Sequence, residues 1–124
     1  MTVRLISGRM LLRLTTMRGD IVTIADRSGE FAGKPRPAIV LQSDAFTRSP
    51  TVAVLPITSA AVDAPLLRVP LAAGEATGLT APSWAQVELI STVRRRRLGA
   101  TIGRADDATM LTVNRALTVF LGLA

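Results

Sequence analysis

The stretch of residues 36–59 reads RPAIVLQSDAFTRSPTVAVLPITS and contains two strong strand signals in close succession. Its two runs of β-branched and apolar residues, 38–42 and 51–57, predict strands. The loop between them, residues 43–50, is rich in turn-forming residues and is short enough for the strands to pair antiparallel. The stretch therefore predicts a β-hairpin.

The register of this hairpin brings two polar side chains together. If Gln42 faces Thr51, then Arg36 faces Ile57, and Thr58 lies one step further along. A guanidinium beside a hydroxyl is a good receptor for a phosphate group, because it offers a bidentate donor and one more O–H. The alternative role for Thr58 is that of an ordinary strand-end hydroxyl bonded to the backbone.

Arg36 stands between Pro35 and Pro37 at the entrance to its strand. Proline fixes its own φ and pushes the residue before it into an extended conformation, so the base of this arginine is stiffened. A site that needs a positioned positive charge would be built this way. The alternative is a surface ion pair with Glu30 or Asp44.

Other segments carry strand signals of different strength. We expect strands at 20–25 and 85–93, a weaker one at 66–71, and a possible short one at 100–103. Pro70 confines the 66–71 strand to an edge or an end, because proline cannot donate to a central ladder.

Only the end of the chain, residues 105–123, has a helical pattern. Its apolar side chains recur at intervals of three and four, at Met110, Val113, Leu117, Phe120 and Leu121. Asp106 and Asp107 are expected in the first turn, where negative charge suits the helix dipole. Short strands closed by one helix predict a mainly β, α+β fold: a small, curved antiparallel sheet or partly open barrel.

Composition narrows the classes of function. The chain has 124 residues, the length of one domain, and its hydrophobic fraction of 48% argues against disorder. No apolar run approaches the roughly 20 residues that span a bilayer, so no membrane contact is expected. Cysteine and histidine are absent, which excludes disulfides and thiolate metal sites and fits a reducing cytoplasm. The carboxylates beyond Asp106 and Asp107 are scattered, and nothing resembles a two-metal nuclease site, so we expect no metal and no cofactor.

The positive charge of the chain is concentrated. Fifteen basic residues against nine acidic ones give a net charge of +6. Residues 1–16 hold Arg4, Arg9 and Arg13 without an acid, and residues 94–97 are four consecutive arginines. A concentrated basic patch is a plausible footprint for phosphate.

Residues 1–16, MTVRLISGRMLLRLTT, are expected to be an extension outside the domain. Met17 opens MRGDIVTIA, which has the character of a natural start, so the domain is expected to span 17–124. The alternative is a short amphipathic segment packed on the domain.

Five motifs carry a resemblance to a known family. MRGDIV, SGEFAGKPRPAIVLQSDAF, TVAVLPITS, GLTAPSWAQVELISTV and RRLGATIGRADDATM resemble, in this order, the MazF/PemK family of toxin endoribonucleases. The resemblance covers about residues 17–123. It implies a small SH3-like antiparallel β-barrel, related to the CcdB fold, with a C-terminal helix.

The resemblance also implies a function. Members of this family are cytoplasmic homodimers that cut single-stranded regions of RNA (messenger, transfer or ribosomal) without metal, through attack by the 2′-OH. A cognate antitoxin of the MazE type, with an acidic C-terminal tail, neutralises them and so restores translation. The catalytic pair of the family falls on Arg36 and Thr58. Contacts to substrate are expected from Ser28, Gly29, Glu30, Lys34, Ser59, Arg94 and Arg95.

One segment departs from the family pattern. Where members commonly read E-Q-(I/L)-R-T-(I/V)-D, residues 88–94 read ELISTVR, so the preference for particular bases is not transferred. The arginine run that follows is either an RNA contact or a patch facing solvent or antitoxin. Trp84 either stacks a base or belongs to the core or an interface. The functional alternatives are a CcdB-like toxin that poisons gyrase and an RNA-binding barrel without catalysis.

Overall fold

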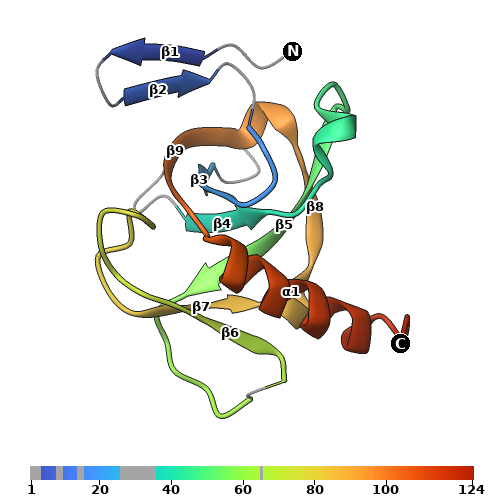
Figure 1. Ribbon diagram of the computed structural model, residues 1–124. Coiled ribbons are helices and arrows are strands. Elements are labelled where there is room, and N and C mark those ends of the chain that lie inside the picture. Colours follow the sequence, from blue (N-terminus) through green and yellow to red (C-terminus); the bar gives the residue numbers. More distant parts are fainter. Residues whose placement is uncertain (1–3, 8–9, 14–15, 26–35, 65) are drawn as a thin grey trace.

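The computed structural model describes the backbone of residues 4–7 and 10–13, together with residues 16–25, 36–64 and 66–124 (Figure 1). The strands are β1 Arg4–Ser7, β2 Met10–Arg13, β3 Asp20–Ile24, β4 Arg36–Val40, β5 Thr51–Thr58, β6 Arg68–Leu71, β7 Ser83–Gln86, β8 Ser91–Arg94 and β9 Leu98–Arg104. Three 3₁₀ turns, η1 Asp44–Phe46, η2 Val87–Leu89 and η3 Arg95–Arg97, and one helix, α1 Asp107–Phe120, complete the elements.

Seven of the strands form one antiparallel sheet that curls back on itself. Their order is β6-β7-β5-β4-β3-β9, and β8 pairs with β5. The chain runs from β8 through η3 directly into β9, so this one segment pairs with β5 at its start and with β3 at its end. It thereby links β5 and β3, the two strands that flank β4, as Figure 1 shows. The predicted α+β fold, an antiparallel barrel-like sheet with a C-terminal helix, is confirmed.

The central strands are buried on both faces, because successive side chains of a strand alternate between faces. One cluster contains Val22, Ala38, Val40, Val52 and Val54, with Val93 and Leu98 packed against it from β8 and β9. The other contains residues of opposite parity, such as Ile21, Ile39 and Leu55, together with Val87 of η2 and Val113 of α1. Fully burying one such side chain stabilises the fold by about 1.5–3 kcal/mol.

The expected single strand at 85–93 is wrong in one respect: it is two strands separated by a turn. Ala85 pairs with Ile57, and Ser91 pairs with Val54, on the same strand β5. The six residue steps from Ala85 to Ser91 therefore lie opposite only three steps of β5, from Ile57 to Val54. The three extra residues form η2, which places Val87 in the core. The expected strand at 66–71 is present as β6 but begins only at Arg68, after a turn, and it lies at the edge of the sheet as Pro70 required.

Helix α1 is capped by Asp106, whose carboxylate accepts the N–H of Thr109 at 2.7 Å. Asp106 is thus the N-cap rather than a first-turn residue, and only Asp107 occupies the first turn. The apolar stripe is buried over its first half, at Met110 and Val113, whereas Phe120 and Leu121 are exposed. No helix within the described residues is both long and apolar enough to cross a membrane.

The Arg-Gly-Asp motif at 18–20 joins the start of β3 to three distant segments. Asp20 is fully buried and pairs with Arg104 of β9 at 2.8 Å. The guanidinium of Arg18 donates to the carbonyl of Leu41 and to the side chain of Asn114 on α1. This motif therefore stabilises the fold.

Candidate active site

The observed register of the hairpin places Arg36 opposite Thr58. Ala38 pairs with Pro56 and Val40 with Val54, so paired residue numbers sum to 94, and two further steps join Arg36 to Thr58. The predicted register, with Arg36 facing Ile57, is wrong by one residue. The prediction that Arg36 and Thr58 lie together at one end of the two strands agrees with this geometry.

The side chain of Gln42 bonds across the hairpin next to the turn. Its amide donates to the carbonyls of Thr51 and Phe46, and its carbonyl oxygen accepts the N–H of Ala53 at 3.1 Å. These three bonds join Gln42 to β5 and to the hairpin loop. The side chain thus closes the hairpin next to the turn.

Both members of the candidate pair have free donor groups. Arg36 is exposed, and among the described residues no side chain or carbonyl bonds to it. Asp44, one of its two expected partners, instead accepts the N–H of Arg18 at 2.7 Å. Thr58 Oγ1 accepts the N–H of Ala60 at 3.1 Å, so its hydrogen remains available to donate. The strand-end hydroxyl does bond the backbone, but as an acceptor.

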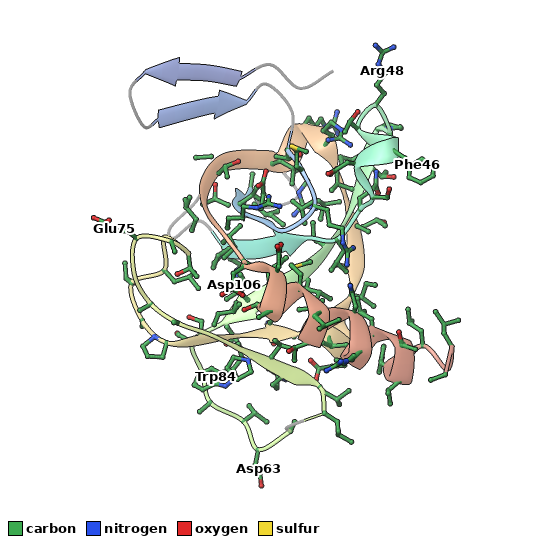
Figure 2. All side chains as sticks on the ribbon, in the orientation of Figure 1. Phe46, Arg48, Asp63, Glu75, Trp84 and Asp106 are labelled. Atoms are coloured by element: carbon green, nitrogen blue, oxygen red, sulfur yellow. The ribbon has the colours of Figure 1, made fainter. Side chains whose placement is uncertain are left out.

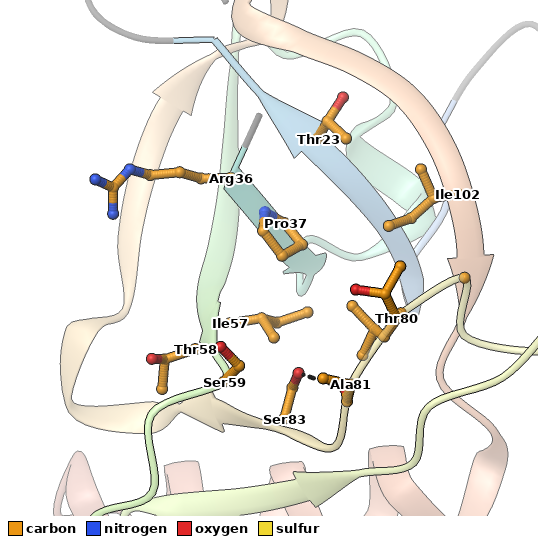
Figure 3. Close-up of a pocket in the computed structure, with 12 residues that line it drawn as sticks. Thr23, Arg36, Pro37, Ile57, Thr58, Ser59, Thr80, Ala81, Ser83 and Ile102 are labelled. Carbon is orange, nitrogen blue, oxygen red and sulfur yellow. Dashed lines mark hydrogen bonds between the residues drawn. The ribbon is translucent and has the colours of Figure 1, made fainter. Parts of the chain in front are cut away.

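A pocket of about 600 Å³ adjoins the pair (Figure 3). It is lined by Thr23, Arg36, Pro37, Ile57, Thr58, Ser59, Gly78, Leu79, Thr80, Ala81, Ser83 and Ile102. Arg36 is the only charged residue among them, and its guanidinium points outward past the rim, on the side where Thr58 also lies. Hydroxyl and apolar groups form the rest of the lining, so the recess suits a neutral planar group better than a phosphate.

One wall of this pocket was not foreseen from the sequence. Residues 76–78, which lead into this wall, lie backbone to backbone against β9, and a Cβ on Gly78 would meet the Ile102 carbonyl oxygen at 2.0 Å. A Cβ on Gly103 would likewise meet the Thr77 carbonyl carbon at 2.1 Å. Two glycines therefore hold the wall in place, and Ser83 Oγ fixes its end by donating to the Ala81 carbonyl at 2.9 Å.

The remaining predicted contacts are scattered. Ser28, Gly29, Glu30 and Lys34 lie outside the described residues, and Ser59 lines the pocket. Arg94 pairs with Thr51, about 23 Å along β5 from Thr58 at the usual strand rise. Arg95 donates to the carbonyls of Ser49 and Phe46. The structure therefore does not bring Arg94 and Arg95 to the candidate pair.

Comparison with known proteins identifies the family. Residues 17–121 match the family described as the PemK-like, MazF-like toxin of type II toxin-antitoxin systems. The chain belongs to this family. It is 43% identical over 107 residues to a probable endoribonuclease MazF of Mycolicibacterium smegmatis, covering 86% of this chain and 97% of that protein.

Solved structures of MazF toxins share the fold. Toxin MazF-mt6 of Mycobacterium tuberculosis matches with a TM-score of 0.70 at 24% identity, covering 84% of this chain and 98% of that one. A MazE–MazF structure from Deinococcus radiodurans matches with a TM-score of 0.72 at 23% identity, covering 89% and 98%. An endoribonuclease in complex with its cognate antitoxin, from a mycobacterial species, matches with a TM-score of 0.67 at 23% identity, covering 90% and 97%. At these identities the likeness concerns the fold.

Proposed function

We propose that this chain is an endoribonuclease toxin that cuts single-stranded RNA at Arg36 and Thr58. The observation that carries the proposal is the opposition of these two side chains across the β4–β5 ladder, with the donor groups of both available to a phosphate. Membership of the MazF family supports it, as does the name of the relative from Mycolicibacterium smegmatis.

RNA supplies its own nucleophile in this mechanism. The 2′-OH attacks the adjacent phosphorus as its proton is removed, and the bond from phosphorus to the 5′-oxygen breaks as that oxygen gains a proton. The products are a 2′,3′-cyclic phosphate and a 5′-hydroxyl. Arg36 would hold the two phosphoryl oxygens, whose charge grows in the transition state, and Thr58 would add one hydrogen bond. One preorganised donor of this kind contributes about 3–4 kcal/mol.

Proton transfer is assigned to water rather than to Arg36. An arginine guanidinium is a poor base, and the sequence contains no histidine. Arg36 therefore acts as a charge stabiliser. The proposed chemistry uses no metal ion, because the arginine and the hydroxyl together stabilise the negative charge that develops on the phosphoryl oxygens.

The proposal includes two protein partners. A second copy of the chain would form a homodimer, and the exposed apolar side chains of Val119, Phe120 and Leu121 offer a surface for such an interface. A cognate antitoxin with an acidic tail would cover Arg36, since a carboxylate can occupy the phosphate position. The toxin would act in the cytoplasm, where its RNA substrate is present.

Mapping of RNA ends tests the function directly. The purified chain and its Arg36→Ala variant are incubated with total RNA, and new 5′ ends are sequenced. We expect new 5′-hydroxyl ends at defined sites with the unmodified chain only. Binding without new ends would indicate a non-catalytic RNA-binding barrel. Loss of supercoiling by gyrase with intact RNA would indicate a CcdB-like toxin.

A further inference from the structure

Trp84 occupies the same cross-strand row as the candidate pair. In β7 it pairs with Thr58 of β5 on one side and with Pro70 of β6 on the other. Continuing the β4–β5 register two residues beyond the Ala38–Pro56 pair sets Arg36 opposite Thr58, so Arg36, Thr58 and Trp84 follow one another in one row across three strands. Residues directly opposite each other in antiparallel strands project from the same face, with Cβ atoms about 4.5–5.5 Å apart. The base of the Trp84 side chain therefore lies beside that of Thr58.

The packing of the core argues against an ordinary core tryptophan at this position. Ser83 and Ala85, its neighbours in β7, are buried, and Ala85 belongs to the main core cluster. Trp84 is half-buried and belongs to neither of the two core clusters. Its side chain therefore leaves the sheet on the face away from the α1-side core, where Arg36 and Thr58 also project.

The polar end of the indole is also unoccupied within the described part of the chain. No hydrogen bond of Trp84 Nε1 is found there, although an indole N–H is a good donor that usually finds a partner when buried. Figure 2 shows the indole at the lower side of the molecule, on which the loop with Asp63 also lies. The next residue in the row, Pro70, is exposed and continues this face toward the sheet edge.

We propose that Trp84 stacks the base of a nucleotide adjoining the scissile phosphate. Neighbouring strands lie about 4.8 Å apart, so the Trp84 backbone is roughly 10 Å from that of Arg36, a separation that a phosphate and its attached nucleoside can span. An aromatic face accepts any base, and stacking on one contributes about five- to 150-fold in affinity. Trp84 would hold the RNA in register while Arg36 and Thr58 contact the phosphate. This proposal rests on the endoribonuclease function proposed above.

The test uses the fluorescence of the protein, because Trp84 is the only tryptophan in the chain. The full chain carrying Arg36→Ala, which leaves RNA intact, is titrated with a single-stranded RNA of mixed sequence. Saturation is followed in parallel by the anisotropy of labelled RNA. We expect RNA to quench the tryptophan emission and to protect it from acrylamide. Unchanged emission and unchanged acrylamide quenching at saturation would refute the stacking.

Kinetics provide the second measurement, in the background of intact Arg36. Trp84→Leu should lower kcat/KM for RNA at least about fivefold, with unchanged product ends, whereas Trp84→Phe should retain most of it. Phe46→Leu, which removes an exposed aromatic ring elsewhere, serves as the matched control and should have no effect. Equal kcat/KM for Trp84→Leu and the unmodified chain would refute the stacking.

Two further outcomes separate the proposal from its premises. If the unmodified chain cuts no RNA, the proposed function itself fails; if it cuts RNA and Trp84→Leu cuts equally well, only the stacking fails. Emission that changes with protein concentration in the absence of RNA would assign Trp84 to a contact between two copies of the chain. That result would also overturn the stacking.

Discussion

Arg97 binds the carbonyl oxygen of Ala25 with two N–H groups, at 2.7 and 3.0 Å, and its own carbonyl accepts the Ala25 N–H at 2.9 Å. Arg95 is similarly engaged with the loop 43–50. The two arginines thus fasten the η3 corner to the end of β3 and to the hairpin loop. Arg94 and Arg96 are exposed and have no such bonds among the described residues. The run of four arginines therefore divides into two structural side chains and two free ones.

This division predicts which arginines contact phosphates. Replacing Arg94 and Arg96 by glutamine should flatten the salt dependence of binding to single-stranded RNA by roughly 0.7 per lost contact. The matched control is Arg115→Gln, an exposed charge on α1 that should leave the slope unchanged. An unchanged slope, accompanied by weaker binding of an acidic peptide, would assign the two arginines to a protein partner instead.

Arg36 should be irreplaceable in catalysis. Lysine cannot reproduce the bidentate fork of the guanidinium, so Arg36→Lys and Arg36→Ala should both lower the cleavage rate by about 100-fold or more. Both variants should fold, because the side chain is exposed and bonds to no described residue. Thr58→Val, which keeps the shape and removes the hydroxyl, should show a smaller loss. Cleavage by Arg36→Lys at a rate close to that of the unmodified chain would contradict the assigned role.

The sequence predicts the hairpin and its polar pair because both depend on local signals. The β-branched runs on either side of residues 43–50 are unambiguous, and the short loop leaves little freedom in how they pair. The register differs from the predicted one by one residue, and Gln42 bonds β5 through its side chain next to the turn. Hydrogen bonds that a side chain makes to the facing strand cannot be read from the alternation of apolar and polar residues in the sequence.

The features that were missed depend on contacts between distant segments. The split of residues 85–93 arises because β7 and β8 share the same neighbour, β5, at different registers. The pocket wall requires Gly78 to meet Ile102, 24 residues later. The position of Trp84 beside Thr58 likewise depends on a strand pairing that spans residues 59–82. Local propensity carries no information on any of these contacts.

The N-cap of α1 should make part of the stability depend on pH. Two hydrogen bonds hold the pKa of Asp106 below its ordinary value of 3.8: the larger effect comes from the hydroxyl of Thr109 and the smaller one from its backbone N–H. Because the folded-state pKa is the lower one, this stabilisation is present above about pH 3.8 and is lost as the pH falls through the folded-state pKa.

The pH effect is measured with variants of the cap. Asparagine at position 106 still accepts a hydrogen bond but carries no charge, so the melting temperature of the unmodified chain should fall relative to that of Asp106→Asn as the pH falls below 3.8. Asp63→Asn, at an exposed loop carboxylate, serves as the control. A constant difference between the melting temperatures of the unmodified chain and Asp106→Asn at pH 2.5 and pH 6 would contradict this prediction.

A chain shortened to residues 17–124 should fold and cut RNA at a comparable rate. Among the described strands, β1 and β2 pair only with each other. The Met17 nitrogen lies 2.8 Å from Asp20 Oδ2, and an α-amino group at that position could still donate to this carboxylate. Circular dichroism and the RNA cleavage assay provide the measurements. An unfolded or inactive product would show that residues 1–16 complete the domain.

The chemistry as a whole is tested by removing metals and by removing the nucleophile. No group of three or more Asp or Glu side chains converges in the described part of the chain, so the proposed reaction should proceed in excess chelator. A single deoxynucleotide at the scissile position should abolish cleavage and leave binding largely intact, because it removes only the 2′-OH. Products should carry a 5′-hydroxyl and a 2′,3′-cyclic phosphate, or the 3′-phosphate formed when that ring opens. Cleavage that stops in chelator, or that continues through the deoxy position, would refute the role of Arg36 and Thr58 even if the protein still arrested growth.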